Sequence, residues 1–290
     1  MRKRIIALNG GLGNQMFQYA FARMLEDRKH CLIEFDTGFY STVNDRKLAI
    51  QNYNIHKYDF CNHEYYNKIR LLFQKIPFVA WLAGTYKEYS EYQLDPRVFL
   101  FNYRFYYGYW QNKQYFENIS NDIRNELSYI GNVSEKENAL LNMLEAHNAI
   151  AIHVRRGDYT QEGYNKIYIS LSKEYYKRAV SIACKELGDN NIPLYVFSDD
   201  IDWCKANLAD IGNVTFVDNT ISSSADIDML MMKKSRCLIT ANSTFSWWSA
   251  WLSDRDDKIV LVPDKWLQDE EKNTKLMKAF ICDKWKIVPV

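Results

Sequence analysis

The stretch AIAIHVRRGD, residues 149–158, decides the fold of the second half of the chain. Its first six residues are apolar apart from His153, which is typical of a strand buried on both faces of a parallel sheet. Charged residues and Gly157 follow at once, so the strand ends there and a loop begins. Open α/β sheets bind ligands beyond the carboxyl ends of their strands, and this loop is therefore a candidate site.

Strands and helices alternate along the rest of the chain. Apolar spacing predicts helices over 173–187, 201–208, 222–234 and 244–252, and strands over 193–197, 214–217, 236–240 and 258–262. This alternation predicts a doubly wound parallel sheet. A closing helix is expected within residues 264–290.

The first half opens in the same way, with a strand over 4–8, a glycine turn, a helix whose apolar stripe runs from Met16 to Leu25, and a strand over 31–35. Residues 37–125 are rich in Tyr, Asn and Phe and predict mixed helices and loops. A charged helix over 132–148 marks a boundary. We predict a first domain over 1–147, a second over 148–265, and a segment over 266–290 that packs back on the first.

Composition narrows the class of protein. The 290 residues carry a net charge of +1, with 47% hydrophobic and 25% charged residues, which is ordinary for a globular protein and argues against nucleic-acid binding. The six cysteines include no Cys-x-x-Cys and predict free thiols in a reducing compartment. No signal peptide or membrane span is expected. We predict a soluble cytoplasmic protein, with peripheral membrane association left open.

Two turns, one rich in glycine and the other in hydroxyl side chains, each connect a predicted strand to a predicted helix. Gly10-Gly11-Leu12-Gly13-Asn14-Gln15 lets the backbone approach a ligand closely at a helix start, although a glycine turn can also serve packing alone. Asn242, Ser243, Thr244 and Phe245 open the second helix, where hydroxyls and free N–H groups suit an anion. A plain helix cap is the alternative for this second turn.

The loop after residue 154 carries the cations. His153 and Arg155 share one face of an extended segment and Arg156 takes the other. Arginine suits a diphosphate because its planar fork binds two oxygens at once. A structural pair of Arg156 with Asp158 is the alternative, and we expect one arginine on the ligand and one on the scaffold.

Acidic residues follow two later segments. Ser198, Asp199 and Asp200 end a strand, where they can accept from ribose hydroxyls or cap the next helix. Asp226-Ile227-Asp228 is a D-x-D sequence, but it lies in a helical first turn, where residues two apart do not face each other. We therefore predict no metal site there, and a structural or nucleotide-contacting role.

Four of these blocks, taken in order, resemble the signature of glycosyltransferase family 11, the α-1,2-fucosyltransferases, in their bacterial soluble type. The blocks span residues 10–20, 153–159, 196–200 and 242–248, and Gly108-Tyr109-Trp110-Gln111 resembles a further block.

The resemblance implies a GT-B architecture of two Rossmann-like domains facing across a cleft. It implies inverting transfer of L-fucose from GDP-β-L-fucose to the 2-hydroxyl of a terminal β-galactose on an oligosaccharide or lipid-linked glycan, with neither metal nor cofactor. Such an activity would suit a role in O-antigen biosynthesis at the inner face of the bacterial membrane.

The resemblance also assigns roles by position. Arg155 grips the β-phosphate, His153 lies against the nucleotide, and Asp228 holds the guanine edge. The other donor-side residues are Arg156, Ser198, Asp199, Asn242, Ser243, Thr244 and Phe245, and Gly11, Gly13, Asn14 and Gln15 lie on the acceptor or fucose side.

The identity of the general base is left open. Asp158 is the first candidate and Glu162 the second, and the reaction could also need no base. The competing role for Asp158 is to orient Arg156. Two other functions are weighed. One is a glycosyltransferase with another donor or linkage, and the other is a catalytically inactive nucleotide-sugar-binding module.

Overall fold

The computed structural model describes residues 2–63, 84–89 and 92–290, and these form two compact units, 1–130 and 131–290. The division therefore lies at Ile130/Gly131, earlier than the predicted 147/148. The reason is helix α6 (Glu135–Ala146), which packs on α9 (Ala225–Lys234) of the second unit and belongs with it.

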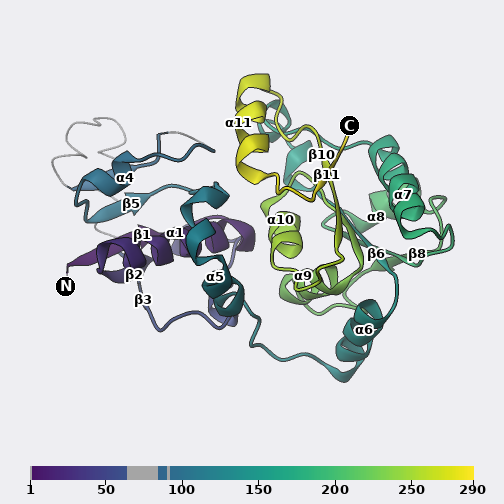
Figure 1. The fold of residues 1–290 in the computed structure, drawn as a ribbon, viewed down its shortest axis with the longest axis horizontal. Coiled ribbons are helices and arrows are strands. Elements are labelled where there is room, and N and C mark those ends of the chain that lie inside the picture. Colours follow the sequence, from purple (N-terminus) through teal and green to yellow (C-terminus); the bar gives the residue numbers. More distant parts are fainter. Residues whose placement is uncertain (1, 64–83, 90–91) are drawn as a thin grey trace. The chain divides into compact units, whose positions relative to one another are not determined.

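The first unit is built on a parallel sheet of five strands in the order β3-β2-β1-β5-β4 (Figure 1). The strands are β1 (Lys3–Ala7), β2 (Leu32–Asp36), β3 (Asp59–Cys61), β4 (Thr85–Lys87) and β5 (Phe105–Tyr107). Within the described part of this unit the helices are α1 (Leu12–Lys29), α4 (Arg97–Leu100) and α5 (Ser120–Glu126). The prediction of mixed helices and loops over 37–125 was wrong for β3, β4 and β5, and its residues 64–83 and 90–91 lie outside the described part.

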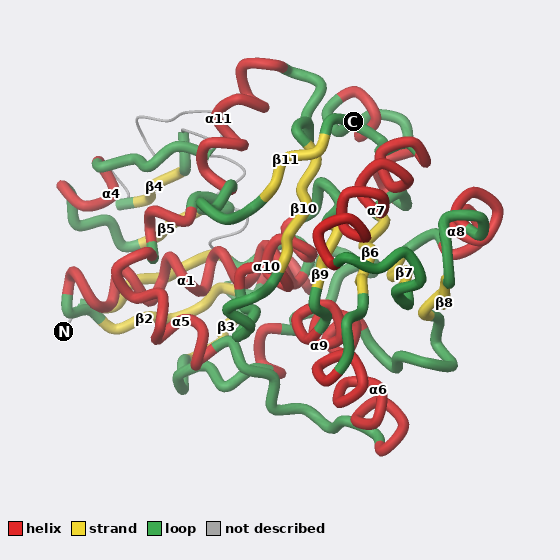
Figure 2. The backbone as a smooth tube through the Cα atoms, turned by 45° about the vertical axis from the view of Figure 1, so that its right-hand side comes forward, coloured by secondary structure: helices red, strands yellow, loops and turns green. Residues whose placement is uncertain are grey.

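The second unit has a parallel sheet of six strands in the order β11-β10-β9-β6-β7-β8 (Figure 2). These strands are β6 (Ile150–Val154), β7 (Leu194–Ser198), β8 (Val214–Val217), β9 (Cys237–Ile239), β10 (Ile259–Pro263) and β11 (Lys286–Val288). Besides α6 and α9 the helices are α7 (Lys173–Leu187), α8 (Ile201–Leu208), α10 (Thr244–Trp251) and α11 (Glu270–Phe280). The predicted doubly wound parallel sheet is confirmed.

The strand order places a topological switch point between β6 and β9. The chain runs outward from β6 through β7 to β8 and then returns to the other side of β6 as β9. Because the strands run outward from this point in opposite directions, right-handed crossovers place α7 and α8 on one face of the sheet and α9 and α10 on the other. Loops diverge at such a point and leave a crevice at the carboxyl ends of the strands.

The closing segment belongs to the second unit. The predicted helix is α11, and β11 after it was missed because it has only three residues. β11 pairs in parallel with β10 along Leu261–Pro263, and the indole of Trp247 in α10 donates to Phe280 O at 2.8 Å. Packing of this segment on the first unit stays a prediction.

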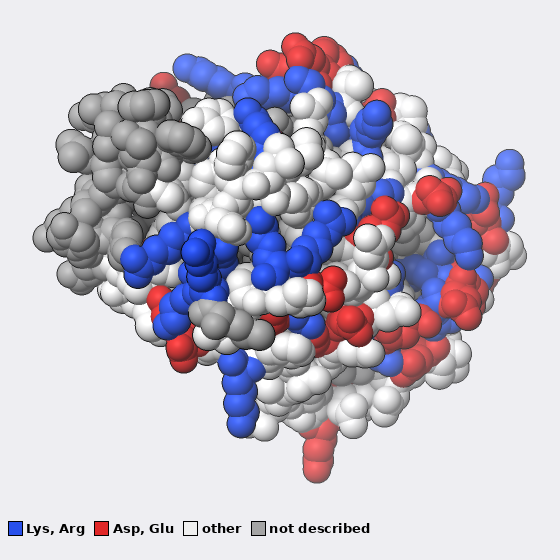
Figure 3. All heavy atoms as spheres, turned by 60° about the vertical axis from the view of Figure 1, so that its left-hand side comes forward, with Lys and Arg blue, Asp and Glu red and all other residues white. Residues whose placement is uncertain are grey.

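Both charge signs occur on the surface drawn in Figure 3, in keeping with the net charge of +1. All six cysteines lie in described residues and none forms a disulfide, which confirms the predicted free thiols. No helix among the described residues combines the length and apolarity that crossing a bilayer requires.

The turn between β1 and α1 is fixed by a buried glutamine. Gln15 is fully buried, and its amide donates to Gly10 O and Lys47 O at 3.2 and 2.8 Å. Its carbonyl oxygen accepts from Ala49 N–H and Ile50 N–H at 2.9 and 3.0 Å. One side chain therefore satisfies four backbone groups of two separate loops.

Replacing this glutamine with an apolar residue of similar size should destabilise the first unit. Gln15→Leu removes the partner of the buried Ile50 N–H and the bonds to Lys47 O and Ala49 N–H, and a buried group left unpaired costs about 1–3 kcal/mol. Thermal unfolding followed by circular dichroism measures the loss, with Gln51→Leu, at an exposed glutamine of the neighbouring loop, as the matched control. Equal unfolding midpoints for the two variants would contradict this role.

Candidate active site

The loop after β6 places Arg155 between two carboxylates. Its guanidinium donates from Nη2 to Asp158 Oδ1 at 2.7 Å and lies 2.9 Å from Asp199 Oδ2 through Nη1. About a quarter of the side chain is exposed. The cation is therefore held in one orientation while part of it stays accessible to a ligand.

Asp199 also holds the backbone of this loop. Its Oδ1 accepts from Arg156 N–H at 2.9 Å and its Oδ2 from Gly157 N–H at 3.1 Å. A Cβ atom at residue 157 would lie 2.7 Å from Asp199 Oδ2, so glycine is required there by close approach. The carboxyl ends of β6 and β7 are thus joined through one carboxylate.

Arg156 packs against α8, and its partner differs from the predicted one. That one arginine binds the ligand and the other serves the scaffold stays a prediction. The Nε of Arg156 donates to Asp200 Oδ2 at 3.3 Å, and its guanidinium lies 4.1 Å from the ring centre of Trp203. Asp158 contacts Arg155, so the pairing of Asp158 with Arg156 was wrong. Asp200 also caps α8, which confirms that one of the two aspartates is a helix cap.

His153 is an uncharged group beside these ions. The side chain is 6% exposed, and its ring centre lies 5.4 Å from that of Phe245. Burial lowers the pKa of His153 to about 4, against the opposing effect of Asp199. Within the described residues its buried Nδ1 has no hydrogen-bond partner.

The turn after β9 is held in place by buried polar contacts. The hydroxyls of Tyr175 and Tyr159 donate to Thr240 O and Asn242 O at 2.8 and 2.9 Å. The Asn242 amide donates to Ile169 O at 2.7 Å and is fully buried, so its nitrogen serves the scaffold rather than the predicted ligand contact. The start of α10 is therefore rigid.

Helix α10 begins directly at this turn. Ser243 is its N-cap, and the serine Oγ accepts from Phe245 N–H at 3.3 Å. Thr244 and Phe245 are partly exposed. The positive end of the helix dipole lies at the carboxyl end of β9, the strand next to β6, which precedes the Arg155 loop.

A cavity of about 340 Å³ lies at the carboxyl ends of β7 and β8. Ser198, Asp199 and Asp228 line it, and these are three of the residues predicted to bind the donor. Sequence analysis missed four other polar lining residues in the loop before α9, namely Asp218, Asn219, Ser222 and Ser224. The position of this loop at a strand end was the signal available for finding them.

Asp228 is the titratable group that burial in this cavity wall affects most. Burial raises its pKa to about 6, against the effect of a hydrogen bond with Ser222. It lies in the first turn of α9, whose N-cap is Ser224, as the serine run predicted. An ionised Asp228 can accept two hydrogen bonds from one ligand edge.

In the first unit, two predicted blocks meet at the ends of β1 and β5. Asn14 Oδ1 accepts from the Gln111 amide at 2.8 Å, and the Gln18 amide donates to Gly108 O at 3.1 Å. Gly11 and Asn14 are partly exposed and Gly13 is buried. Gln15 is buried and bonded to backbone groups, so its position does not agree with the predicted contact to the acceptor or to fucose.

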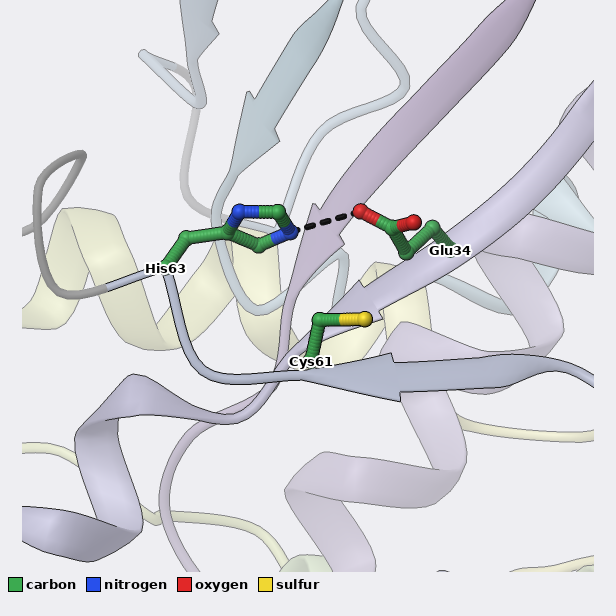
Figure 4. A group of neighbouring side chains, drawn as sticks. All are labelled: Glu34, Cys61 and His63. Carbon is green, nitrogen blue, oxygen red and sulfur yellow. Dashed lines mark hydrogen bonds and ion pairs between the residues drawn. The ribbon is translucent and has the colours of Figure 1, made fainter.

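The first unit also contains one cluster of metal-ligand type, Glu34, Cys61 and His63, with ligand atoms within 4.8 Å of one another (Figure 4). Glu34 Oε1 lies 2.6 Å from His63 Nε2, and Oε2 lies 2.5 Å from Lys3 Nζ. Because the protein already supplies a partner to each carboxylate oxygen, we treat the cluster as an ion-pair network. That the chain needs no metal stays a prediction.

Comparison with known proteins gives matches along nearly the whole chain. The family model "Glycosyl transferase family 11" matches residues 2–288. Two Escherichia coli proteins are each 30% identical: an alpha-1,2-colitosyltransferase (93% of this chain, 94% of that protein) and the O-antigen biosynthesis glycosyltransferase WbnK (94% and 98%). The mouse galactoside 2-alpha-L-fucosyltransferase Sec1 is 23% identical over 87% of this chain and 64% of its own length.

Two solved structures share the fold. NodZ alpha-1,6-fucosyltransferase soaked with GDP-fucose has a TM-score of 0.50 at 14% identity, over 90% of this chain and 94% of that one. Arabidopsis thaliana FUT1 in complex with GDP has a TM-score of 0.53 at 9% identity, over 89% and 70%. The chain belongs to glycosyltransferase family 11, and its two Rossmann-like units are those of the GT-B fold.

Proposed function

We propose that this glycosyltransferase moves L-fucose from GDP-β-L-fucose, with inversion and without a metal, to the 2-hydroxyl of a terminal β-galactose. The observation that carries the proposal is the shared carboxylate of Asp199, which lines the cavity and contacts Arg155. A nucleoside in the cavity would therefore have its diphosphate beside Arg155. The acceptor would be an oligosaccharide or lipid-linked glycan of the kind that O-antigen synthesis uses.

The leaving group explains the composition of the site. When the glycosidic bond breaks, negative charge develops on the phosphate oxygens of GDP. Arg155 and the start of α10 present fixed donors to that charge, and fixed donors need no reorganisation during the reaction. Asp158, bound to Arg155 at 2.7 Å, orients this cation before the donor arrives. We also propose Asp158, in preference to Glu162, as the general base that accepts the proton of the acceptor hydroxyl.

A second donor has specific support. The alpha-1,2-colitosyltransferase is 30% identical to this chain over 93% of its length. Colitose is L-fucose without the 3-hydroxyl, so both donors present the same guanine and diphosphate to the second unit. Contacts to the sugar ring alone would discriminate between them.

A competition assay tests donor, metal and linkage together. Purified protein is given GDP-fucose and GDP-colitose, separately and in mixture, with a panel of galactose-terminated acceptors in excess EDTA. We expect fucosyl transfer to persist in EDTA and the product to show a 1,2 linkage by NMR. Preference for GDP-colitose would reassign the donor, and loss of turnover restored by a divalent cation would overturn the metal-free mechanism. Donor binding with neither transfer nor hydrolysis would indicate a binding module.

Removing the accessible arginine should affect the reaction more than the fold. Arg155→Ala is expected to lower kcat by about 10²–10³, which is the usual effect of removing one hydrogen-bond donor that stabilises the charge developing in a transition state. Arg156→Ala is the matched control, because it removes an identical charge from the scaffold side and should mainly lower the unfolding temperature. A kcat for Arg155→Ala near that of wild type would refute the role.

Donor affinity should weaken in acid because of Asp228. Only the ionised carboxylate accepts from the guanine edge, and its pKa is about 6, so protonation competes with binding as the pH falls through 6. Affinity for GDP-fucose should fall about tenfold from pH 7 to pH 5, one proton being taken up per site. Calorimetry measures this, and GDP-fucose is preferred to GDP because it has no terminal phosphate that titrates in this range. Asp228→Asn should bind weakly with a flat profile, and an unchanged slope in this variant would assign the titration elsewhere.

A further inference from the structure

The first turn of α6 is joined to the loop that forms one wall of the cavity. Glu137 lies in this turn and is 4% exposed. Its Oε1 accepts from Ser223 N–H at 2.8 Å, and its Oε2 accepts from the N–H and hydroxyl of Ser134 at 2.9 and 2.6 Å. One oxygen therefore serves its own helix, and the other serves a loop 86 residues away.

That loop, residues 218–224, supplies much of the cavity wall. Asp218, Asn219, Ser222 and Ser224 line the cavity, and Ser224 caps the helix that carries Asp228. Lys136, next to Glu137, donates from its ammonium to Thr220 O. Two adjacent residues of α6 thus hold the loop backbone at two points.

The contact with Ser223 goes beyond helix capping. The capping box of α6 is complete with Ser134 and Glu137 alone. Burial by itself would raise the pKa of Glu137, but hydrogen bonds from Ser134 and Ser223 outweigh it and lower the pKa to about 2. An ionised carboxylate makes the stronger kind of hydrogen bond, so Ser223 N–H is firmly held.

We propose that Glu137 is a positioning residue for the donor, which fixes loop 218–224 and thereby holds Ser222, Ser224 and Asp228 in place for the nucleoside. This inference rests on the proposed function for its ligand, and on the bonds of Glu137 for its mechanism. Glu137 does not line the cavity, so it acts through the loop.

Glu137 is also part of the charged surroundings of Asp228. Burial is the main cause of the raised pKa of Asp228, and the charge of Glu137 adds to it. Asp199 and Asp218 share the cavity wall with Asp228, and Asp226 lies in the same turn of α9. Of the remaining packed elements, α10 carries no titratable side chain and β6 carries only His153. Neutralising Glu137 should therefore let Asp228 ionise at lower pH.

Hydrogen exchange of the full chain without ligand tests the mechanism directly. Glu137→Ala should speed amide exchange in loop 218–224 by about tenfold, the effect expected from losing one charge-assisted hydrogen bond. Glu137→Gln keeps an acceptor oxygen and should retain most of the protection. Glu135→Gln, at an exposed glutamate in the same turn, is the charge-matched control and should exchange like wild type. Unchanged exchange in Glu137→Ala would overturn the proposal.

Kinetics and binding test the consequence for the donor. Glu137→Ala should raise the KM for GDP-fucose about tenfold with kcat changed less than about twofold. Glu137→Gln should recover most of the KM and shift the acid loss of GDP-fucose affinity to lower pH. Ser134→Ala removes the capping serine but leaves the Ser223 contact, so it should lower the unfolding temperature at a wild-type KM.

The outcomes separate the two proposals. If Ser134→Ala raises the KM as much as Glu137→Ala, Glu137 is only a helix cap and the inference is overturned. If wild-type protein binds no GDP-fucose, the proposed function and the donor role fail together. The exchange result then still decides whether Glu137 holds the loop.

Discussion

The carboxylate of Asp199 is the contact on which the ligand-facing edge of the second unit depends. It accepts from two successive backbone N–H groups, at Arg156 and Gly157, and it pairs with the guanidinium of Arg155. It also lines the cavity beyond β7. A single side chain therefore fixes a loop, aims a cation and forms part of a pocket wall, and loss of its charge would disturb all three.

The same contact explains why two neighbouring arginines have different tasks. Side chains of successive residues in an extended segment point to opposite sides. Arg155 turns toward Asp158 and Asp199, and Arg156 turns toward Asp200 and toward Trp203 on α8. An arginine stacked on an indole and paired with a carboxylate is a packing element as much as a charge. From their adjacent positions in the sequence alone, Arg155 and Arg156 would be taken for a single cationic patch.

Whether a strand could be predicted from the sequence depends on how deeply that strand is buried. Strands β6 and β7 are buried along nearly their whole length, so their sequences are almost continuously apolar and their bounds were predicted within a residue or two. Strands β3, β4 and β5 have three residues each, which is too short for an alternating apolar pattern to develop. They form because β1 and β2 offer backbone partners, which is a tertiary effect that local patterns do not carry.

The candidate site shows a related limit. Gln15 and Asn242 stand inside motifs that suggest a ligand, yet both side chains are buried and their amides bond backbone groups of neighbouring segments. Motif position alone cannot distinguish a polar side chain that satisfies the scaffold from one that satisfies a ligand, because both tasks select the same residue types. The contribution of Glu137 was invisible for another reason, since its partner Ser223 lies 86 residues away.

The charge arrangement before donor binding bears on the base. Arg155 contacts two carboxylates, so its charge is largely compensated while the site is empty. A guanidinium has five N–H donors and can be shared, but a diphosphate brings like charge close to Asp158 and Asp199. Asp199 is anchored by two backbone N–H groups, whereas Asp158 lies in a short 3-10 turn, Asp158–Thr160, three residues from its arginine. A diphosphate would therefore compete with both carboxylates for the Arg155 guanidinium. We propose that Asp158, once displaced from this cation, acts as the base, so that orientation of Arg155 and proton acceptance are successive states of one residue.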